Sequence, residues 1–359
     1  MARAIAAARA VRGTTSPNPP VGAALVRDEK VVAVGATAPY GGPHAEAAAL
    51  ANIDARGATL YTTLEPCMPF EGKRTPPCTD AIVAAGVAKV VVAIEDPHAP
   101  VRGEGMAALT AAGIAVELGD GAKAVTDLLR PYLKFRARGT PYVIAKFAIS
   151  LDGKVGVPAS GVRWLTGQGA RERAHQDRAW VDAIMVGSGT VIADNPELTA
   201  RPRGDPAAHQ PVRIVLDGRG LVSSDARVLG PGCIVATARR DREFRDRVTS
   251  TGATVLEIEH TAEGLVLPQF LRILAQRGIV SVIAEGGPTV LQSLFEGELV
   301  DEVHVYVAPI ILGEAGLPLF PRGGRFEPAR LNEVVVETIS PDVLIRGYTG
   351  TWAPAEARR

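Results

Sequence analysis

The sequence has little of what disulfide-bonded, membrane-spanning or nucleic-acid-binding proteins need. Only three of its 359 residues are cysteines, Cys67, Cys78 and Cys233, which excludes a disulfide framework. No stretch of the sequence approaches the roughly 18 uncharged apolar residues that a transmembrane helix requires. The 39 basic and 39 acidic residues cancel, which argues against a nucleic-acid partner, because such binding normally needs a basic surface.

The N-terminus also lacks the features of an export signal. It is rich in alanine with interspersed arginine, but it has no apolar core followed by a cleavage site. Together with the few cysteines this favours a reducing compartment, so we expect a cytoplasmic protein. The hydrophobic fraction of 47% and the charged fraction of 22% are ordinary for a globular protein, and the length of 359 residues favours two domains.

Three segments in the first half of the chain carry side chains that zinc prefers. They are Pro43-His44-Ala45-Glu46, Glu65-Pro66-Cys67 and Pro76-Pro77-Cys78. One imidazole and two thiolates suit zinc, and three protein ligands leave one coordination position open for water. A glutamate two residues after the histidine is the expected proton carrier. This combination is typical of zinc deaminases, in which a water activated by the metal replaces an amino group.

The spacing of the two cysteines departs from the usual pattern. Zinc deaminases commonly have two residues between the thiolates, whereas here ten residues, Met68 to Pro77, separate Cys67 from Cys78. A loop rich in glycine and proline must therefore return the chain to the metal. The alternative is that both cysteines are core residues and His44 caps a helix. Cys78 begins an apolar helical run, which favours metal binding because a helix N-terminus lowers the pKa of a thiol.

Strand and helix patterns alternate along the whole chain, which predicts an α/β fold with two domains. The turn-like Arg138-Gly139-Thr140-Pro141 marks the boundary, so we predict one domain at 1–139 and a second at 140–359. In the first domain we expect a three-layer α/β/α arrangement around one mixed sheet. The strands expected there are 21–26, 31–35, 59–63, 90–94 and 114–118, and the helices are 3–12, 43–55, 78–85, 106–112 and 125–136.

The second half predicts further strands and one long helix. The strands are expected at 142–150, 183–186, 213–217, 233–236, 255–258, 280–284, 303–308 and 343–352, and the helix at 169–180. Two glycine-rich turns follow such strands, Gly187-Ser188-Gly189-Thr190 and Glu285-Gly286-Gly287-Pro288-Thr289. A glycine pair before a helix is typical of a phosphate site, although close packing also requires glycine. Only two lysines, Lys146 and Lys154, occur after residue 140, so each is a candidate for a specific contact, unless codon usage alone explains their scarcity.

The order of these segments resembles that of the bifunctional riboflavin-biosynthesis deaminase/reductase family over nearly the whole chain. The N-terminal segments that carry the resemblance are Pro17-Asn18-Pro19-Pro20-Val21-Gly22, Pro43-His44-Ala45-Glu46, Thr63-Leu64-Glu65-Pro66-Cys67 and Arg74-Thr75-Pro76-Pro77-Cys78. The C-terminal ones are Ser150-Leu151-Asp152-Gly153-Lys154, Trp164-Leu165-Thr166, Gly187-Ser188-Gly189-Thr190-Val191, Asp194-Asn195-Pro196, Glu285-Gly286-Gly287-Pro288-Thr289 and Ala308-Pro309.

The resemblance implies a cytidine-deaminase-like domain followed by a dihydrofolate-reductase-like domain. It implies zinc-dependent deamination of 2,5-diamino-6-(5-phosphoribosylamino)pyrimidin-4-one and then reduction of the ribosyl group to ribityl by NADPH. The expected cofactors are one zinc ion per chain and NADPH. The expected partner is a small phosphoribosyl-pyrimidine, with no nucleic acid and no membrane, and we expect a homo-oligomer, either a dimer or a tetramer.

Site residues follow from the resemblance position by position. His44, Cys67 and Cys78 would bind zinc, Glu46 would be catalytic and Asn18 would contact the pyrimidine. The positions that match nicotinamide-cofactor contacts are Ala148, Trp164, Thr190, Asp194, Gly287, Pro288, Thr289, Val290, Leu291, Gln292 and Ser293. The positions that match substrate contacts are Leu198, Arg201 and Glu285, and either Lys146 or Lys154 would meet the phosphate or hydroxyl groups.

The loop between the cysteines leaves two alternatives open. The family usually has eight residues there, including a Ser-His pair, so this chain could instead be a related deaminase/reductase of a secondary pathway that acts on another aminopyrimidine. The other alternative is a working reductase beside a zinc-binding module without catalytic activity. Glu46 argues against that second alternative, since a structural zinc site needs no proton carrier. The exact substrate, the oligomeric state and the transfer of intermediate between the sites stay open.

Overall fold

The computed structural model describes residues 1–69, 71, 75–156, 164–262, 264–320 and 328–354. Within these ranges the chain forms two compact units, Met1–Gly139 together with Pro354, and Thr140–Ala353. No helix in the described ranges is long and apolar enough to cross a membrane.

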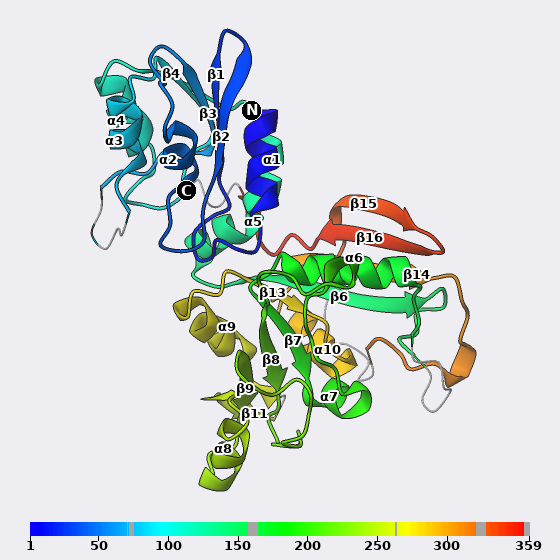
Figure 1. The fold of residues 1–359 in the computed structure, drawn as a ribbon. Helices are drawn as coiled ribbons and strands as arrows, with labels where there is room; N and C mark the ends of the chain where they lie inside the picture. Colours follow the sequence, from blue (N-terminus) through cyan, green and yellow to red (C-terminus); the bar gives the residue numbers. More distant parts are fainter. Residues whose placement is uncertain (70, 72–74, 157–163, 263, 321–327, 355–359) are drawn as a thin grey trace. The chain divides into compact units, whose positions relative to one another are not determined.

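The first unit is built on one mixed five-stranded sheet, as predicted (Figure 1). Strands β3, β4 and β5 are parallel, whereas β1 pairs antiparallel with both β2 and β3. The strand order is β2-β1-β3-β4-β5. The bounds are Gly22–Arg27 for β1, Lys30–Ala36 for β2, Thr59–Leu64 for β3, Lys89–Ile94 for β4 and Ala115–Leu118 for β5.

Helices cover both faces of this sheet and make it the middle of three layers. A Cβ atom on Gly22 would lie 1.9 Å from the carbonyl oxygen of Ala4 in α1, and one on Gly35 would lie 2.2 Å from that of Ala45 in α2. Because the hairpin register puts these two glycines on opposite faces, α1 and α2 pack on opposite sides. The helices are α1 Ala2–Ala10, α2 Ala45–Leu50, α3 Cys78–Ala84, α4 Glu104–Ala111 and α5 Ala122–Arg138.

Helix α2 is shorter than the range 43–55 expected from the sequence. It begins one residue after His44 and ends at Leu50. Ala51 has an extended backbone with ψ of 129°, and Asn52 is in the left-handed region with φ of 57°. Asparagine is one of the few residues that adopt this conformation readily, so it ends the helix.

The second unit contains a nine-stranded sheet in which seven neighbouring strands are parallel. The order is β10-β9-β8-β7-β13-β6-β14-β16-β15, and β16 runs antiparallel to both β14 and β15. Strands β6 to β10 are Tyr142–Ser150, Ala183–Gly187, Val212–Leu216, Cys233–Thr237 and Thr254–Glu257. The others are β13 Ser281–Ala284, β14 Glu302–Ala308, β15 Asn332–Ile339 and β16 Asp342–Tyr348, and a separate pair consists of β11 His260–Thr261 and β12 Gly264–Leu265.

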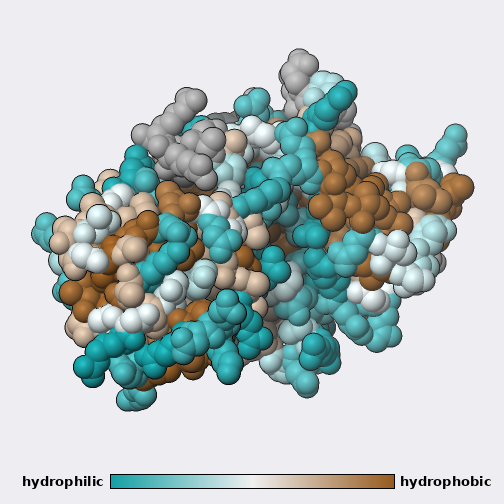
Figure 2. All heavy atoms as spheres, turned by 90° about the horizontal axis from the view of Figure 1, so that it is seen from above, coloured by the Kyte–Doolittle hydropathy of each residue, from teal (hydrophilic) through white to brown (hydrophobic). Residues whose placement is uncertain are grey.

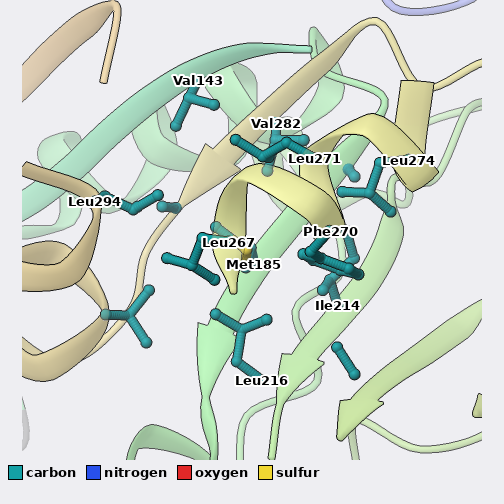
Figure 3. Close-up of a cluster of buried hydrophobic side chains, with 14 of the residues drawn as sticks. Val143, Met185, Ile214, Leu216, Leu267, Phe270, Leu271, Leu274, Val282 and Leu294 are labelled. Atoms are coloured by element: carbon teal, nitrogen blue, oxygen red, sulfur yellow. The ribbon is translucent and has the colours of Figure 1, made fainter. Parts of the chain in front are cut away.

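A large apolar core lies between this sheet and the helices α9 and α10. Figure 3 shows Phe270 and Leu274 of α9 beside Ile214 of β8, and Leu294 of α10 belongs to the same cluster. Each fully buried side chain of this kind stabilises the fold by about 1.5–3 kcal/mol. The helices of this unit are α6 Gln168–Ala179, α7 Ser188–Asp194, α8 Arg242–Thr249, α9 Leu267–Gln276 and α10 Pro288–Glu296, with 3₁₀ turns at Pro202–Gly204 and Gly313–Ala315.

Helix α6 is joined to strand β14 by a buried network of charged and polar groups. His304 lies with Nδ1 3.1 Å from Asp177 Oδ2 and with Nε2 2.8 Å from Glu302 Oε1. Asp177 also accepts hydrogen bonds from Arg173 Nε at 3.2 Å and from the hydroxyl of Tyr306 at 3.1 Å. Burial alone would lower the pKa of His304, but the two carboxylate partners raise that pKa from 6.5 to about 9.

This network makes the stability of the second unit depend on pH. The raised pKa of His304 means that its contribution is complete below about pH 6.5 and is lost as the pH rises through about 9. The free energy of unfolding should therefore fall over this interval by at most about 3 kcal/mol. Denaturant unfolding followed by tryptophan fluorescence measures it, because all three tryptophans lie in residues 140–353. His304→Gln should remove this decline, and the same decline in that variant would assign it to another group.

Candidate functional site

His44, Cys67 and Cys78 bring three ligand atoms together in the first unit. The atoms lie within 4.8 Å of one another, and His44 Nδ1 is 3.4 Å from each of the two Sγ atoms. A nitrogen and a sulfur ligand on a tetrahedral zinc are about 3.5 Å apart, given Zn–N of about 2.0 Å and Zn–S of about 2.3 Å. The residues therefore fit zinc in type and in spacing. Among the described residues, this is the one cluster of three His, Cys, Asp or Glu side chains with such an arrangement.

Two helix N-termini and one strand end position these ligands. His44 is the residue before α2, Cys78 is the first residue of α3, and Cys67 follows β3. The backbone N–H of Thr79 donates to the carbonyl of Cys67 at 3.3 Å, and the N–H of Cys78 donates to Cys67 Sγ at 3.5 Å. These bonds bring the chain back to Cys67 in spite of the ten residues that separate the two cysteines. Residues 70 and 72–74 of that loop lie outside the described ranges.

Thr75 supports the imidazole from its other side, a role that sequence reasoning missed. Its Oγ1 lies 3.2 Å from His44 Nε2. When Nδ1 binds a metal, Nε2 carries the proton and donates it to this hydroxyl, which fixes the orientation of the ring. Thr75 is part of the segment before Cys78 that carries the family resemblance, but nothing in the sequence distinguishes it from a loop threonine.

Glu46 lies beside the ligand cluster with its side chain buried. One oxygen, Oε2, is 3.4 Å from Cys78 Sγ, and the other, Oε1, is 3.4 Å from Thr62 Oγ1. Burial, together with the neighbouring Cys67 thiolate, raises the pKa of Glu46 to about 7. A carboxyl group with this pKa can both accept and donate a proton near neutral pH, as a general acid–base catalyst must.

Glu65 has a structural role, because it fixes the segment that leads to Cys67. Its carboxylate accepts the backbone N–H groups of Asp96, Gly103 and Met106 at 3.0–3.2 Å. Helix α4 comes so close that a Cβ on Gly105 would lie 2.1 Å from the carbonyl oxygen of Pro66. The start of α4 therefore holds the backbone next to Cys67, a candidate zinc ligand, in one position.

Asn18, for which the family resemblance implies a contact with the pyrimidine, lies in the turn that precedes β1. Its carbonyl accepts a hydrogen bond from Thr15 Oγ1 at 2.9 Å, and its N–H donates to the carbonyl of Thr15 at 3.0 Å. The half-buried side chain is held on a well-defined turn, and its contact with a pyrimidine stays a prediction.

The donor set predicts about one zinc ion per chain. Cys78→Ser should remove most of the metal, because a neutral hydroxyl replaces a thiolate ligand. Cys233→Ser, which changes a buried cysteine of the second unit, should keep the zinc and is the matched control. Elemental analysis of the two purified variants measures the stoichiometry. Full zinc occupancy in Cys78→Ser would contradict the assignment of this ligand.

In the second unit, the two glycine-rich turns that the sequence separates by about a hundred residues lie side by side. They follow β7 and β13, which are parallel neighbours. A Cβ on Gly287 would lie 3.1 Å from Thr190 Oγ1, and a Cβ on Gly187 would lie 2.8 Å from Val290 Cγ2. The turns thus form one surface at the carboxyl ends of the strands, where α/β folds bind their ligands.

The surface has the features of an anion site. Helix α10 begins at Pro288 after Gly287, and among the described residues no side chain caps its first turn. The N–H groups of such a turn bind phosphate well, and glycine lets the anion approach the backbone. This part of the structure therefore fits the phosphates of a nicotinamide cofactor.

The remaining predicted cofactor residues are distributed around this end of the unit. Ala148 lies on β6, Asp194 is exposed at the end of α7, and Trp164 is exposed with the guanidinium of Arg171 5.3 Å from its ring centroid. Of the predicted segment 287–293, the side chains of Leu291 and Gln292 are buried. Val290 is buried as well, and the contact of this segment with a cofactor stays a prediction.

A compact cluster of charges lies at the end of β13, beside these turns. Glu285 accepts hydrogen bonds from Arg178 Nε at 2.7 Å and Arg178 Nη2 at 2.8 Å, and Lys146 Nζ lies 3.3 Å from Glu285 Oε2. Burial opposes the charge on Glu285, but the two cations hold the pKa of this carboxyl well below its usual range. The sequence identified Lys146 and Glu285 but not Arg178, because an arginine on a helix gives no signal of its partner.

The structure separates the two candidate lysines. Lys154 lies in the turn after β6, and its side chain covers Gly316, where a Cβ would lie 2.6 Å from Lys154 Cγ. Of the other predicted substrate residues, Leu198 is buried with a left-handed backbone, and the N–H of Arg201 donates to His175 Nδ1 at 3.2 Å. Of the two lysines, Lys146 is the one in contact with Glu285.

A side chain at position 287 should interfere with cofactor binding. Gly287→Val is expected to raise the NADPH dissociation constant by about tenfold or more, near 1.4 kcal/mol, because the branched side chain blocks the approach of phosphate to the backbone. Gly189→Ala is the comparison, since a Cβ there meets no protein atom within 4 Å. Fluorescence titration with NADPH measures both. Unchanged affinity in Gly287→Val with weaker binding in Gly189→Ala would place the phosphates on the turn after β7.

Family comparisons match both halves of the chain. Residues 1–94 match the cytidine and deoxycytidylate deaminase zinc-binding region, and residues 141–345 match the RibD C-terminal domain. The riboflavin biosynthesis protein RibD of Bacillus amyloliquefaciens is 40% identical over 353 residues, which cover 96% of this chain and 94% of that protein. RibD of Escherichia coli is 38% identical over 330 residues, covering 87% of this chain and 88% of that protein.

Solved structures of similar proteins cover nearly the whole chain. Acinetobacter baumannii RibD has a TM-score of 0.86 and 35% identity, with 97% of each chain covered. The diaminohydroxyphosphoribosylaminopyrimidine deaminase/5-amino-6-(5-phosphoribosylamino)uracil reductase of Thermotoga maritima has a TM-score of 0.85 and 33% identity, again with 97% of each chain covered.

Proposed function

This chain belongs to the family of bifunctional riboflavin-biosynthesis deaminase/reductases, and we propose that its two activities use the two residue clusters described above. It is an enzyme with a zinc-dependent deaminase activity and an NADPH-dependent reductase activity. In our assignment His44, Cys67 and Cys78 hold the zinc, and Glu46 carries the protons. The reductase centre is then the cluster of Lys146, Arg178 and Glu285 next to the glycine-rich turns.

The deaminase step follows from the surroundings of Glu46. Zinc, when bound, activates a water for attack on the carbon that carries the amino group of the substrate. Glu46 accepts a proton from this water and delivers it to the leaving nitrogen, which departs as ammonia. Its pKa near 7 suits both transfers, and Thr62 holds the carboxyl group at a fixed place beside the ligands. A zinc module without catalytic activity would have no use for this buried carboxyl group.

The reductase step depends on how the second cluster holds the ribosyl group. NADPH, when bound, supplies the hydride for the ribosyl carbon. The oxygen released from that carbon needs a proton, and we assign the donation of this proton to the Lys146 ammonium. Glu285 orients this ammonium, and Arg178 keeps the carboxylate ionised and fixed. Holding NADPH and the ribosyl carbon in line is the main contribution that the protein makes to hydride transfer.

We further propose that the protein is a cytoplasmic homo-oligomer. Edge strand β15 exposes Val334, Val335 and Val336 to the extent of 50–63%. Exposed apolar edge strands are usual sites of association between copies. Figure 2 shows apolar side chains gathered in patches between hydrophilic ones on the visible face. The structure joins none of Cys67, Cys78 and Cys233 in a disulfide, which agrees with a reducing compartment.

Glu46→Gln tests the deaminase assignment. The variant should keep its zinc and its fold but release ammonia at least about 10²-fold more slowly, since general acid–base catalysis contributes that much or more. With the already deaminated substrate, NADPH oxidation should be unchanged. Near-normal ammonia release would assign the proton transfers to another group.

Removal of zinc from the intact protein is the complementary measurement. A chelator should abolish ammonia release and leave NADPH oxidation with deaminated substrate unaffected, because Glu285 is the one potential metal ligand in the second cluster and it is already paired with Arg178 and Lys146. Loss of both activities in folded protein would contradict two independent centres.

A further inference from the structure

Tyr306 lies between the proposed reductase centre and the network that joins α6 to β14. The Lys146 Nζ atom is 5.3 Å from the centroid of its ring, and its hydroxyl donates to Asp177 Oδ2 at 3.1 Å. The strand register pairs Lys146 with His304 and Ala148 with Tyr306, so the lysine and the tyrosine lie on the same face of the sheet. Tyr306 is buried, with 1% of its surface exposed.

The position of the Lys146 ammonium depends on more than its contact with Glu285. Both oxygens of Glu285 already bind Arg178 at 2.7–2.8 Å, whereas Lys146 Nζ lies 3.3 Å from one of them. A lysine side chain has four rotatable bonds, and a single long contact restrains it poorly. The face of the Tyr306 ring supplies a second attraction, because its quadrupole is negative where the ammonium lies.

We propose that Tyr306 is a positioning residue for the reduction. Its ring holds the Lys146 ammonium beside Glu285, and its hydroxyl, bound to Asp177, keeps the ring from tilting away. This inference rests on the role of Lys146 in the proposed function.

Helix α6 anchors both residues that contact Lys146, Tyr306 and Glu285. Asp177 and Arg178 are consecutive residues of this helix. Asp177 anchors the Tyr306 hydroxyl, and Arg178 anchors Glu285. Arg173, one turn earlier, donates to Asp177 Oδ1 at 3.2 Å and keeps the anchor in place. A single rigid helix therefore sets both the ring and the carboxylate between which the ammonium lies.

Substitutions at Tyr306 test the proposal in the intact protein. Tyr306→Leu removes the ring and should lower kcat for reduction of the deaminated substrate by about tenfold or more. Tyr306→Phe keeps the ring and loses the hydroxyl, so it should retain most of the activity, within about threefold of the wild type. Neither should change the NADPH dissociation constant by more than about twofold, because the cofactor turns are not touched.

Tyr142 provides the matched control. It is a buried tyrosine on the neighbouring strand β6, and its hydroxyl donates to Glu302 Oε2 at 3.2 Å. Tyr142→Leu and Tyr142→Phe should lower the melting temperature as much as the Tyr306 variants do, but should leave kcat within about twofold. The proposal would be overturned if kcat fell in proportion to the melting temperature in the Tyr142 variants as well as in the Tyr306 variants. Such a result would show a structural effect only.

Lys146→Met separates a failure of this inference from a failure of the proposed function. The variant should lose at least about 10²-fold in kcat for reduction while deamination continues. Reduction at the wild-type rate would remove Lys146 from the proposed function and the positioning role of Tyr306 with it. A large loss in Lys146→Met combined with unchanged kcat in Tyr306→Leu would overturn the positioning role alone.

Discussion

Buried carboxylates that accept backbone N–H groups fix the backbone at several points in both units. In the first unit, Glu65 binds three N–H groups around the start of α4. In the second, Asp182 accepts the N–H groups of Val280 and Ser281 at 2.8 Å, and Asp301 accepts that of Val143 at 2.7 Å. An ionised carboxylate away from water is stable only with such donors, and each donor in turn loses its water, so the arrangement has one geometry.

Burial also sets the chemistry of the two centres, in opposite directions. Glu46 lies among sulfur atoms and other weak partners, so burial raises its pKa to about 7 and lets it exchange protons. Glu285 is also enclosed, but two cations reach it and keep it charged. In the proposed function the same side-chain type therefore moves protons in one unit and holds a cation in the other, and the neighbours decide which.

The sequence predicted the fold class and the three side chains that the structure gathers at the candidate zinc site, because both depend on local patterns. Apolar periodicity locates strands such as β6, and the types of residue at positions 44, 67 and 78 indicate zinc. Strand β15 was missed because most of its side chains are exposed on both faces and show no alternation. Arg178, Thr75 and Tyr306 were missed for another reason: their partners are distant in sequence, and only tertiary packing brings them together. The apolar spacing of Leu267, Phe270, Leu271 and Leu274 does predict α9, which was also overlooked.

The contact between α4 and the Pro66 carbonyl restricts how this protein can change over evolutionary time. Any side chain at position 105 would push on the backbone that precedes Cys67. The candidate metal site therefore limits which substitutions are tolerated in α4, although α4 itself contributes no metal ligand. Relaxed selection on deamination would remove that limit before it altered the ligands themselves. In lineages that lose the activity, position 105 should therefore be among the early places to accumulate larger residues.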